Sequence, residues 1–182
     1  MKPQMRKIIL TSLLLFSSHA AMADKSDFKT GPVIEAYGEN AIINNGLTSP
    51  ETQNFKVLFD VSDKNDSDKP HKGFNTVARF INMHVRAGVP LEQLDVAMVI
   101  HGGASFELMA ANAYKKRFAK DNQSADLLKS LIDAGVKVVV CGQSASYHEI
   151  TTDDLAKGVE MSLSAMTANA LLQQQGFTLN PF

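Results

Sequence analysis

The chain has 182 residues, with 18 Lys and Arg against 19 Asp and Glu, and a single cysteine. Its net charge of −1 offers no basic surface for a nucleic-acid partner, and we expect none. One cysteine excludes an intramolecular disulfide, so packing or association must stabilise the fold.

The first 23 residues have the pattern of a secretory signal peptide. Three basic residues precede or begin the apolar stretch around Ile8–Phe16, and Ala21-Met22-Ala23 fits the small-x-small cleavage pattern. Cleavage at Asp24 removes three basic residues and no acidic one, which leaves a net charge near −4. The apolar stretch is shorter than the roughly 20 residues that span a bilayer. We therefore expect a periplasmic protein with no integral membrane segment after signal removal.

The mature chain is predicted to begin with an irregular arm, residues 24–54, in which Gly and Pro interrupt short apolar pieces. Phe55–Val61 is apolar enough to be a central strand. After a polar loop, the apolar spacing from Phe74 to Val85 becomes that of one helical face. Phe80 and Met83 point away from the centre of this face. Such a second apolar surface favours a homo-oligomer, and the alternative is that the arm folds over these two side chains.

The rest of the chain alternates strands and helices, as in an α/β domain. The predicted strands are Val96–Ile100, Val136–Val140 and a short edge strand at Gly158–Ser162. The predicted helices are Phe106–Ala119, Ala125–Ala134 with Ser124 as N-cap, and a helix from Ser164 to Gln175. This alternation predicts one domain over residues 55–182: a three-layer α/β/α fold around a mainly parallel sheet of about five strands.

The carboxyl ends of parallel strands are where ligands gather in such folds. Three segments are predicted to meet there: Asp60 with Ser62, His101-Gly102-Gly103, and Cys141-Gly142-Gln143-Ser144. The glycines allow backbone amides to approach a ligand closely. We therefore take Gly102, Gly103, Gly142, Gln143 and Ser144 as candidate ligand-binding residues around an anion.

Cys141 is a candidate reactive thiol, because it stands between a run of valines and a turn-like segment. A nearby cation or helix N-terminus lowers a thiol pKa from its reference value near 8.5. His101 is the candidate for that influence, and these two residues are the candidate catalytic pair. The alternative is a buried, inert Cys141 beside a hydrogen-bonded His101. No tight ligand spacing predicts a metal site, and no cofactor is implied.

The chain resembles the DsrE/DsrF-like family of sulfur-relay proteins from about Phe55 to its C-terminus, and most resembles the exported branch. The residues that carry the resemblance are His101-Gly102, Tyr114, Asn122, Ala134-Gly135-Val136, Val140-Cys141-Gly142-Gln143-Ser144, Ser164-Ala165-Met166-Thr167-Ala168, Leu172-Gln173 and Gly176-Phe177.

The resemblance implies a three-layer α/β/α domain, homo-oligomers, and a Cys141 that accepts sulfane sulfur as a persulfide. Tyr147-His148-Glu149 departs from the small and basic residues of cytoplasmic relay subunits, so their docking partners do not carry over. The expected function is periplasmic sulfur relay, as a sulfurtransferase or a carrier, with donor and acceptor unidentified. The alternatives are a non-catalytic binding or assembly module with a structural cysteine, and a redox-sensing thiol.

Overall fold

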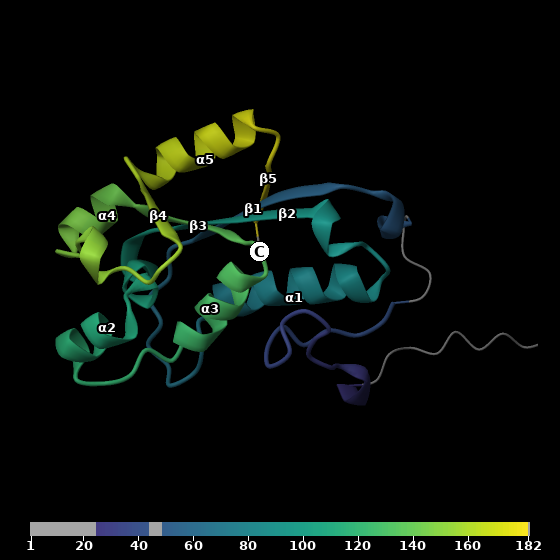
Figure 1. The fold of residues 1–182 in the computed structure, drawn as a ribbon, viewed down its shortest axis with the longest axis horizontal. Coiled ribbons are helices and arrows are strands. Elements are labelled where there is room, and N and C mark those ends of the chain that lie inside the picture. Colours follow the sequence, from purple (N-terminus) through teal and green to yellow (C-terminus); the bar gives the residue numbers. More distant parts are fainter. Residues whose placement is uncertain (1–24, 44–48, 182) are drawn as a thin grey trace, which may run out of the picture.

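A computed structural model describes residues 25–43 and 49–181, and the predicted signal peptide lies outside these residues. Its centre is a five-stranded sheet in the order β4-β3-β2-β1-β5, in which all neighbouring strands are parallel (Figure 1). The strands are β1 (Phe55–Val61), β2 (Leu94–Ile100), β3 (Lys137–Cys141), β4 (Val159–Ser162) and β5 (Thr178–Asn180). The predicted parallel α/β architecture is confirmed.

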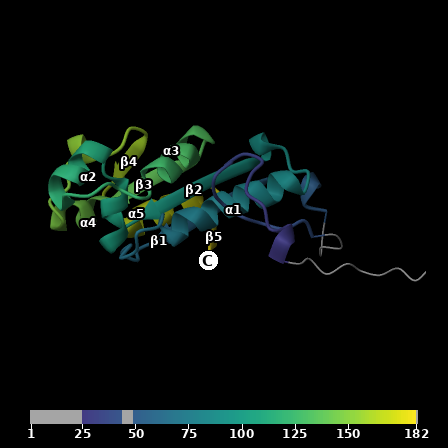
Figure 2. The same cartoon turned by 90° about the horizontal axis from the view of Figure 1, so that it is seen from below.

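Helices cover both faces of the sheet. They are α1 (Lys72–Arg86), α2 (Ala111–Phe118), α3 (Ala125–Asp133), α4 (Gly142–Tyr147) and α5 (Ala165–Gln174). Short 3₁₀ helices occupy Lys25–Asp27, Pro50–Thr52, Leu91–Gln93, Gly102–Leu108 and Thr152–Asp154. Figures 1 and 2 show α5 on one side of the sheet and α1 and α3 on the other, with α2 and α4 gathered at one end. We call the two sides the α5 face and the α1/α3 face.

Strand residues alternate between the two faces, as the period of a β-strand requires. Phe59, Met98 and Val138 belong to the core on the α1/α3 face, together with Phe74 of α1. The core on the α5 face consists of Leu58, Ala97, Val99, Val139, Cys141, Ala165, Ala168, Leu172 and Phe177. Cys141 thus faces α5.

The N-terminal arm is fixed to one strip of α1. Asn82 is fully buried; its Oδ1 accepts from the amides of Val33 and Ile34, and its Nδ2 donates to carbonyls of the same segment. The Arg86 guanidinium donates to four carbonyls of the arm, those of Lys29, Thr30, Gly31 and Asn40. Buried polar groups of this kind need such partners. The arm is irregular, as predicted, and its backbone is held by side chains of α1.

The predicted second apolar surface of α1 is only partly present. Phe80 packs within its own chain, with ring centroids 6.1 Å from Phe55 and 5.6 Å from Phe59. Met83 is 39% exposed. The arm lies along the polar strip of α1, where Asn82 and Arg86 offer it hydrogen bonds. Packing of Phe80 within its own chain leaves less apolar surface on α1 than expected, and the homo-oligomer stays a prediction.

The single helix predicted over residues 106–119 is wrong, because the chain changes direction at Met109. A 3₁₀ helix ends at Leu108, and α2 begins at Ala111. In between, Met109 forms a bridge with Leu155, and the Ala110 amide donates to the Asp154 carbonyl at 2.8 Å. Backbone bonds to a segment more than 40 positions away thus replace those of a continuous helix.

Ser124 is the N-cap residue of α3, as predicted, but its side chain does not cap the helix. Its hydroxyl donates to the buried Glu107 carboxylate at 2.5 Å and accepts from the His71 amide at 2.9 Å. A buried carboxylate needs a donor, and Ser124 supplies it. By contrast, Ser164 caps α5 as predicted, because its hydroxyl accepts from the Thr167 amide.

Candidate functional site

Cys141, His101 and Asp60 lie at the carboxyl ends of three neighbouring strands. Cys141 is the last residue of β3, His101 directly follows β2, and Asp60 is the penultimate residue of β1. The alternation of each strand places all three on the α5 face, since Val139, Val99 and Leu58, each two positions earlier, belong to its core. The strand-end cluster predicted from the sequence therefore forms on one face of the sheet.

The Cys141 sulfur sits among hydrogen-bond donors from two helix starts. The side chain is 5% exposed, and its Sγ accepts from the Ser144 amide at 3.5 Å. Burial by itself raises the pKa of the thiol. Hydrogen bonds from the Ser144 side chain and from the amides of Ser144, Ala165 and Gln143 outweigh it, so the net pKa lies below its usual value. Such donors stabilise the thiolate, which is the nucleophilic form.

Ser144 links the loops that follow β2 and β3. Its hydroxyl oxygen accepts from the Gly102 amide at 2.9 Å. That contact fills an acceptor position of the hydroxyl and directs its hydrogen toward the sulfur. Gln143, in contrast, extends toward the β4–α5 connection, where its Nε2 donates to the Leu163 carbonyl at 3.2 Å.

The His101 imidazole is oriented by a carboxylate, that of Asp60. The sequence had instead predicted that His101 acts directly on the Cys141 thiol. Its Nε2 lies 3.0 Å from Asp60 Oδ1, and both side chains are about one-third exposed. The other carboxylate oxygen of Asp60 accepts from Asn169 Nδ2 on α5 at 3.2 Å. The main contributions that lower the Cys141 pKa come from Ser144 and backbone amides instead of His101.

Steric constraints explain the glycines at the strand ends. A Cβ on Gly142 would lie 2.6 Å from the Ser162 carbonyl oxygen, and one on Gly103 would lie 2.6 Å from Lys64 Cβ. Gly102 adopts a φ of +53°, which disfavours other residues. These positions let the loops approach one another closely. Their predicted role in binding a ligand stays a prediction.

Comparison with known proteins identifies the relatives of this fold. The sequence model of the DsrE/DsrF-like family matches residues 56–181. The chain therefore belongs to the DsrE/DsrF-like family. A solved structure, that of a protein of unknown function from Methanobacterium thermoautotrophicum, shares the fold with a TM-score of 0.50 and 17% identity. The match covers 70% of this chain and 98% of that one. No curated protein matches the sequence.

Two contributors to this DsrE/DsrF-like site were not predicted. The Ala165 amide, at the first position of α5, acts on Cys141, and Asn169, one turn later, contacts Asp60. The Ser164 cap predicted where α5 begins, but nothing in the sequence fixes the strand ends over which this helix passes. Asp60 itself was expected at this edge without an assigned role.

Apolar side chains surround the segments that hold Cys141. Four of them are strongly exposed for their type: Tyr147 at 85%, Met161 at 40%, Leu163 at 72% and Met166 at 80%. Tyr147 is the last residue of α4. Met161 and Leu163 flank Ser162, which pairs with Cys141. Met166 lies in the first turn of α5. Met161 pairs with Val140, which belongs to the α1/α3 face, so it points away from the thiol. Leu163 and Met166 flank the start of α5, whose Ala165 amide contacts Cys141.

The part of the chain that the structure describes shows neither a metal cluster nor a membrane span. Within residues 25–43 and 49–181, no three His, Cys, Asp or Glu side chains gather in a way that would hold a metal ion. No helix in those ranges combines the length and apolar character needed to cross a bilayer.

Proposed function

We propose that the protein is a periplasmic sulfane-sulfur carrier that holds sulfur on Cys141 as a persulfide. The observation that carries this proposal is the set of donors around Sγ, which lowers the pKa of the only cysteine. The DsrE/DsrF-like family is linked to sulfur relay. The same donors would stabilise the terminal sulfur of a persulfide, which is also an anion.

The chemistry of loading is a thiol exchange. A lone pair of the Cys141 thiolate forms a bond to the terminal sulfur of a donor R–S–SH. The donor S–S bond breaks, and its electron pair leaves with the thiolate of R. That thiolate takes up the proton that Cys141 lost. The products are Cys141–S–SH and R–SH, so no external oxidant or reductant is required.

The decisive experiment is intact-mass analysis of the mature protein after incubation with inorganic polysulfide. We expect a gain of one sulfur atom that dithiothreitol removes and that Cys141→Ser abolishes. A gain that persists in Cys141→Ser, or no gain in the wild type, would reject the carrier.

One observation favours a second candidate, a non-catalytic module with a structural cysteine. Cys141 is 95% buried and belongs to the core of the α5 face. In that case iodoacetamide would label the folded protein no faster than global unfolding allows. Rapid, stoichiometric labelling in native buffer would exclude this candidate. Both a sulfur carrier and a redox-sensing thiol would give that result.

Location and assembly are further parts of the proposal. We infer that the chain is exported and cleaved before Asp24, because residues 1–23 have the pattern of a signal peptide. N-terminal sequencing of periplasmic material should begin at Asp24, and full-length chain in the cytoplasm would contradict export. We also infer a homo-oligomer from the family resemblance. Light scattering of the mature protein at micromolar concentration should give more than one chain mass.

A further inference from the structure

We infer that Asp60 is a positioning residue for His101, and that the two act as a proton relay for Cys141. This inference rests on the proposed sulfur transfer and assigns the proton that the transfer must move. It concerns the row of side chains formed by Asp60 on β1, His101 after β2 and Cys141 on β3.

The register of the sheet places His101 beside Cys141. The last paired positions of β2 and β3 are Ile100 and Val140. His101 is extended, with φ −147° and ψ −176°, and its amide donates to the Val61 carbonyl, so the strand geometry continues by one residue. Neighbouring strands are about 4.8 Å apart. The two side chains therefore leave adjacent strands on the same face.

The Asp60 contact selects one tautomer of the imidazole. Asp60 Oδ1 lies 3.0 Å from His101 Nε2, and a carboxylate accepts, so the hydrogen belongs on Nε2. Nδ1 then carries the lone pair and can accept a proton. This is the logic by which a carboxylate orients a catalytic imidazole in hydrolytic triads.

Asp60 is itself fixed from the opposite layer. Its Oδ2 accepts from Asn169 Nδ2, and Asn169 Oδ1 is buried with no hydrogen-bond partner among the described residues. The amide orientation is therefore set by Asp60. The titratable groups that flank His101 on this face are Asp60 on β1 and Cys141 on β3, while α5 contributes the uncharged Asn169.

The relay accounts for the proton that moves in the loading step. The Cys141 thiol gives its proton to His101 Nδ1 as the sulfur attacks the terminal sulfur of R–S–SH. The imidazolium, held by Asp60, then gives that proton to the departing thiolate of R. His101 ends in its starting state, and the net reaction is the exchange described above. General acid and base transfer of this kind typically contributes 10²- to 10⁴-fold to a rate.

The test compares Asp60→Asn with Asp95→Asn. Asp95 is a matched control, because it lies on the same face at the amino end of β2, where it pairs with Lys56 at 3.6 Å. The rate of persulfide formation from inorganic polysulfide is measured by quenching and mass analysis. We expect Asp60→Asn and His101→Gln each to slow it by about tenfold or more. Asp95→Asn should match the wild type, and the Asp60→Asn/His101→Gln double variant should be no slower than His101→Gln alone.

A second readout needs no sulfur chemistry. Long-range ¹⁵N–¹H NMR couplings report the tautomer of His101, whose signal is assigned by its loss in His101→Gln. We expect the Nε2–H form in the wild type and in Asp95→Asn, and a mixture in Asp60→Asn. Circular dichroism must show that each variant is folded.

The outcomes separate this inference from the proposed function. An Asp60→Asn variant that equals Asp95→Asn in rate, or an unchanged tautomer, overturns the role of Asp60 while the carrier stands. An effect of Asp60→Asn that adds fully to that of His101→Gln overturns the relay. A wild type that takes up no sulfur overturns the carrier and the relay together, and the tautomer then still decides whether Asp60 positions the ring.

Discussion

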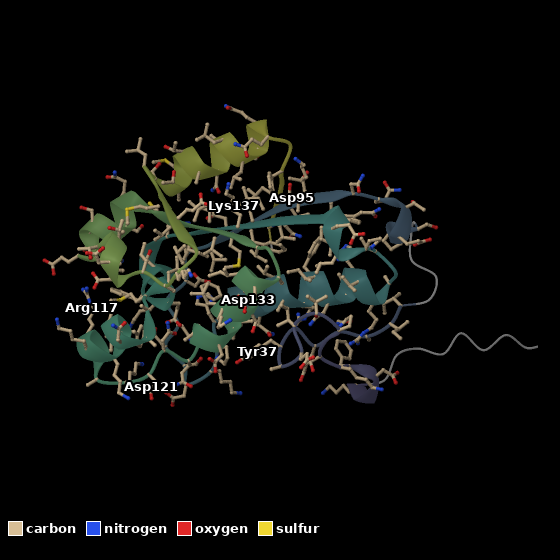
Figure 3. The ribbon with its side chains drawn as sticks, viewed as in Figure 1. Tyr37, Asp95, Arg117, Asp121, Asp133 and Lys137 are labelled. Atoms are coloured by element: carbon tan, nitrogen blue, oxygen red, sulfur yellow. The ribbon has the colours of Figure 1, made fainter. Side chains whose placement is uncertain are left out.

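The two faces of the sheet differ in what their strands carry. The α1/α3 face is lined by apolar side chains along the strands, from Val57 and Phe59 to Val138 and Val140. The α5 face is apolar only at its middle. Ion pairs Lys56–Asp95 and Lys137–Glu160 occupy its amino end, where Asp95 and Lys137 are labelled in Figure 3. Its carboxyl end carries the thiol and the His101–Asp60 pair. One face therefore builds most of the core, and the other can expose chemistry at its edge.

The largest expected effect tests the energetic side of this contrast. Phe74 is fully buried on the α1/α3 face, and Leu172 is 5% exposed on the α5 face. We expect Phe74→Ala to cost about 4 kcal/mol in the free energy of unfolding and Leu172→Ala about 2–3 kcal/mol. The difference arises because a single helix can settle into the smaller cavity. Urea unfolding measures both, and a Leu172→Ala cost as large as that of Phe74→Ala would contradict the contrast.

The N-terminal arm contributes to the stability of the α1/α3 side through its hydrogen bonds with Arg86. Arg86→Gln removes a guanidinium that binds four arm carbonyls, and we expect a loss of about 1–2 kcal/mol and faster proteolysis within residues 25–43. Arg79→Gln is the matched control on the same helix, since among the described residues Arg79 donates to one arm carbonyl, that of Glu39. Its effect should be smaller. Equal effects of the two variants would mean that the arm is not held through Arg86.

On the α5 face, the Ser144→Ala variant tests what stabilises the Cys141 thiolate. This change removes the hydroxyl hydrogen bond and leaves the backbone amides, so the pKa of Cys141 should rise and alkylation at pH 7 should slow severalfold. Iodoacetamide rates against pH give the midpoint. Ser146→Ala, an exposed position of the same helix, should leave the midpoint in place. A midpoint unchanged by Ser144→Ala would assign the thiolate to the amides alone.

The same pKa shift predicts a pH dependence of stability. The folded pKa of Cys141 lies below its unfolded value, so ionisation favours the folded state. That contribution is fully present above the unfolded pKa, near 8.5, and is lost as the pH falls through the folded pKa. The stability of the wild type relative to Cys141→Ser should therefore rise from pH 7 to pH 9. A difference that falls over this range would reverse the assigned sign.

The smallest expected effect concerns strain beside the site. Glu149 follows α4 with a φ of +54°, a conformation that glycine adopts without penalty. Glu149→Gly should stabilise the fold by up to about 1 kcal/mol, because the Arg117 contact uses the Glu149 backbone carbonyl and is retained. Figure 3 labels Arg117 at this end of the molecule. Thermal unfolding compares the variant with the wild type, and a lower midpoint would show that the Glu149 side chain is needed.

The sequence predicted the elements whose signals are local. The valine run of β3, the apolar spacing of α1 and α3, and the Ser164 cap of α5 all lie within a few residues of what they specify. The break at Met109 depends on Leu155, and the placement of the arm depends on the polar residues Asn82 and Arg86. Those signals come from distant partners, so periodicity along the chain does not reveal them.

The candidate site was predicted in the same uneven way. The rule that parallel strands end at one edge brought Asp60, His101 and Cys141 together. The partner of His101 depends on the register of β1 against β2, which pairs Asp60 with Val99 and sets Asp60 diagonal to His101. Sequence pattern fixes the face of a strand but not its register, and that is why the sequence placed His101 beside the thiol without identifying Asp60 as its hydrogen-bond partner.

Both margins of the sheet are short strands. β4 has four residues and β5 has three, while the central β1 and β2 have seven each. The outer side of a strand presents unpaired amides and carbonyls, which recruit extended segments of other chains when the margin is long and flat. Here another chain could add only a few backbone hydrogen bonds at either margin. The short margins thus disfavour fibre-like growth by strand addition.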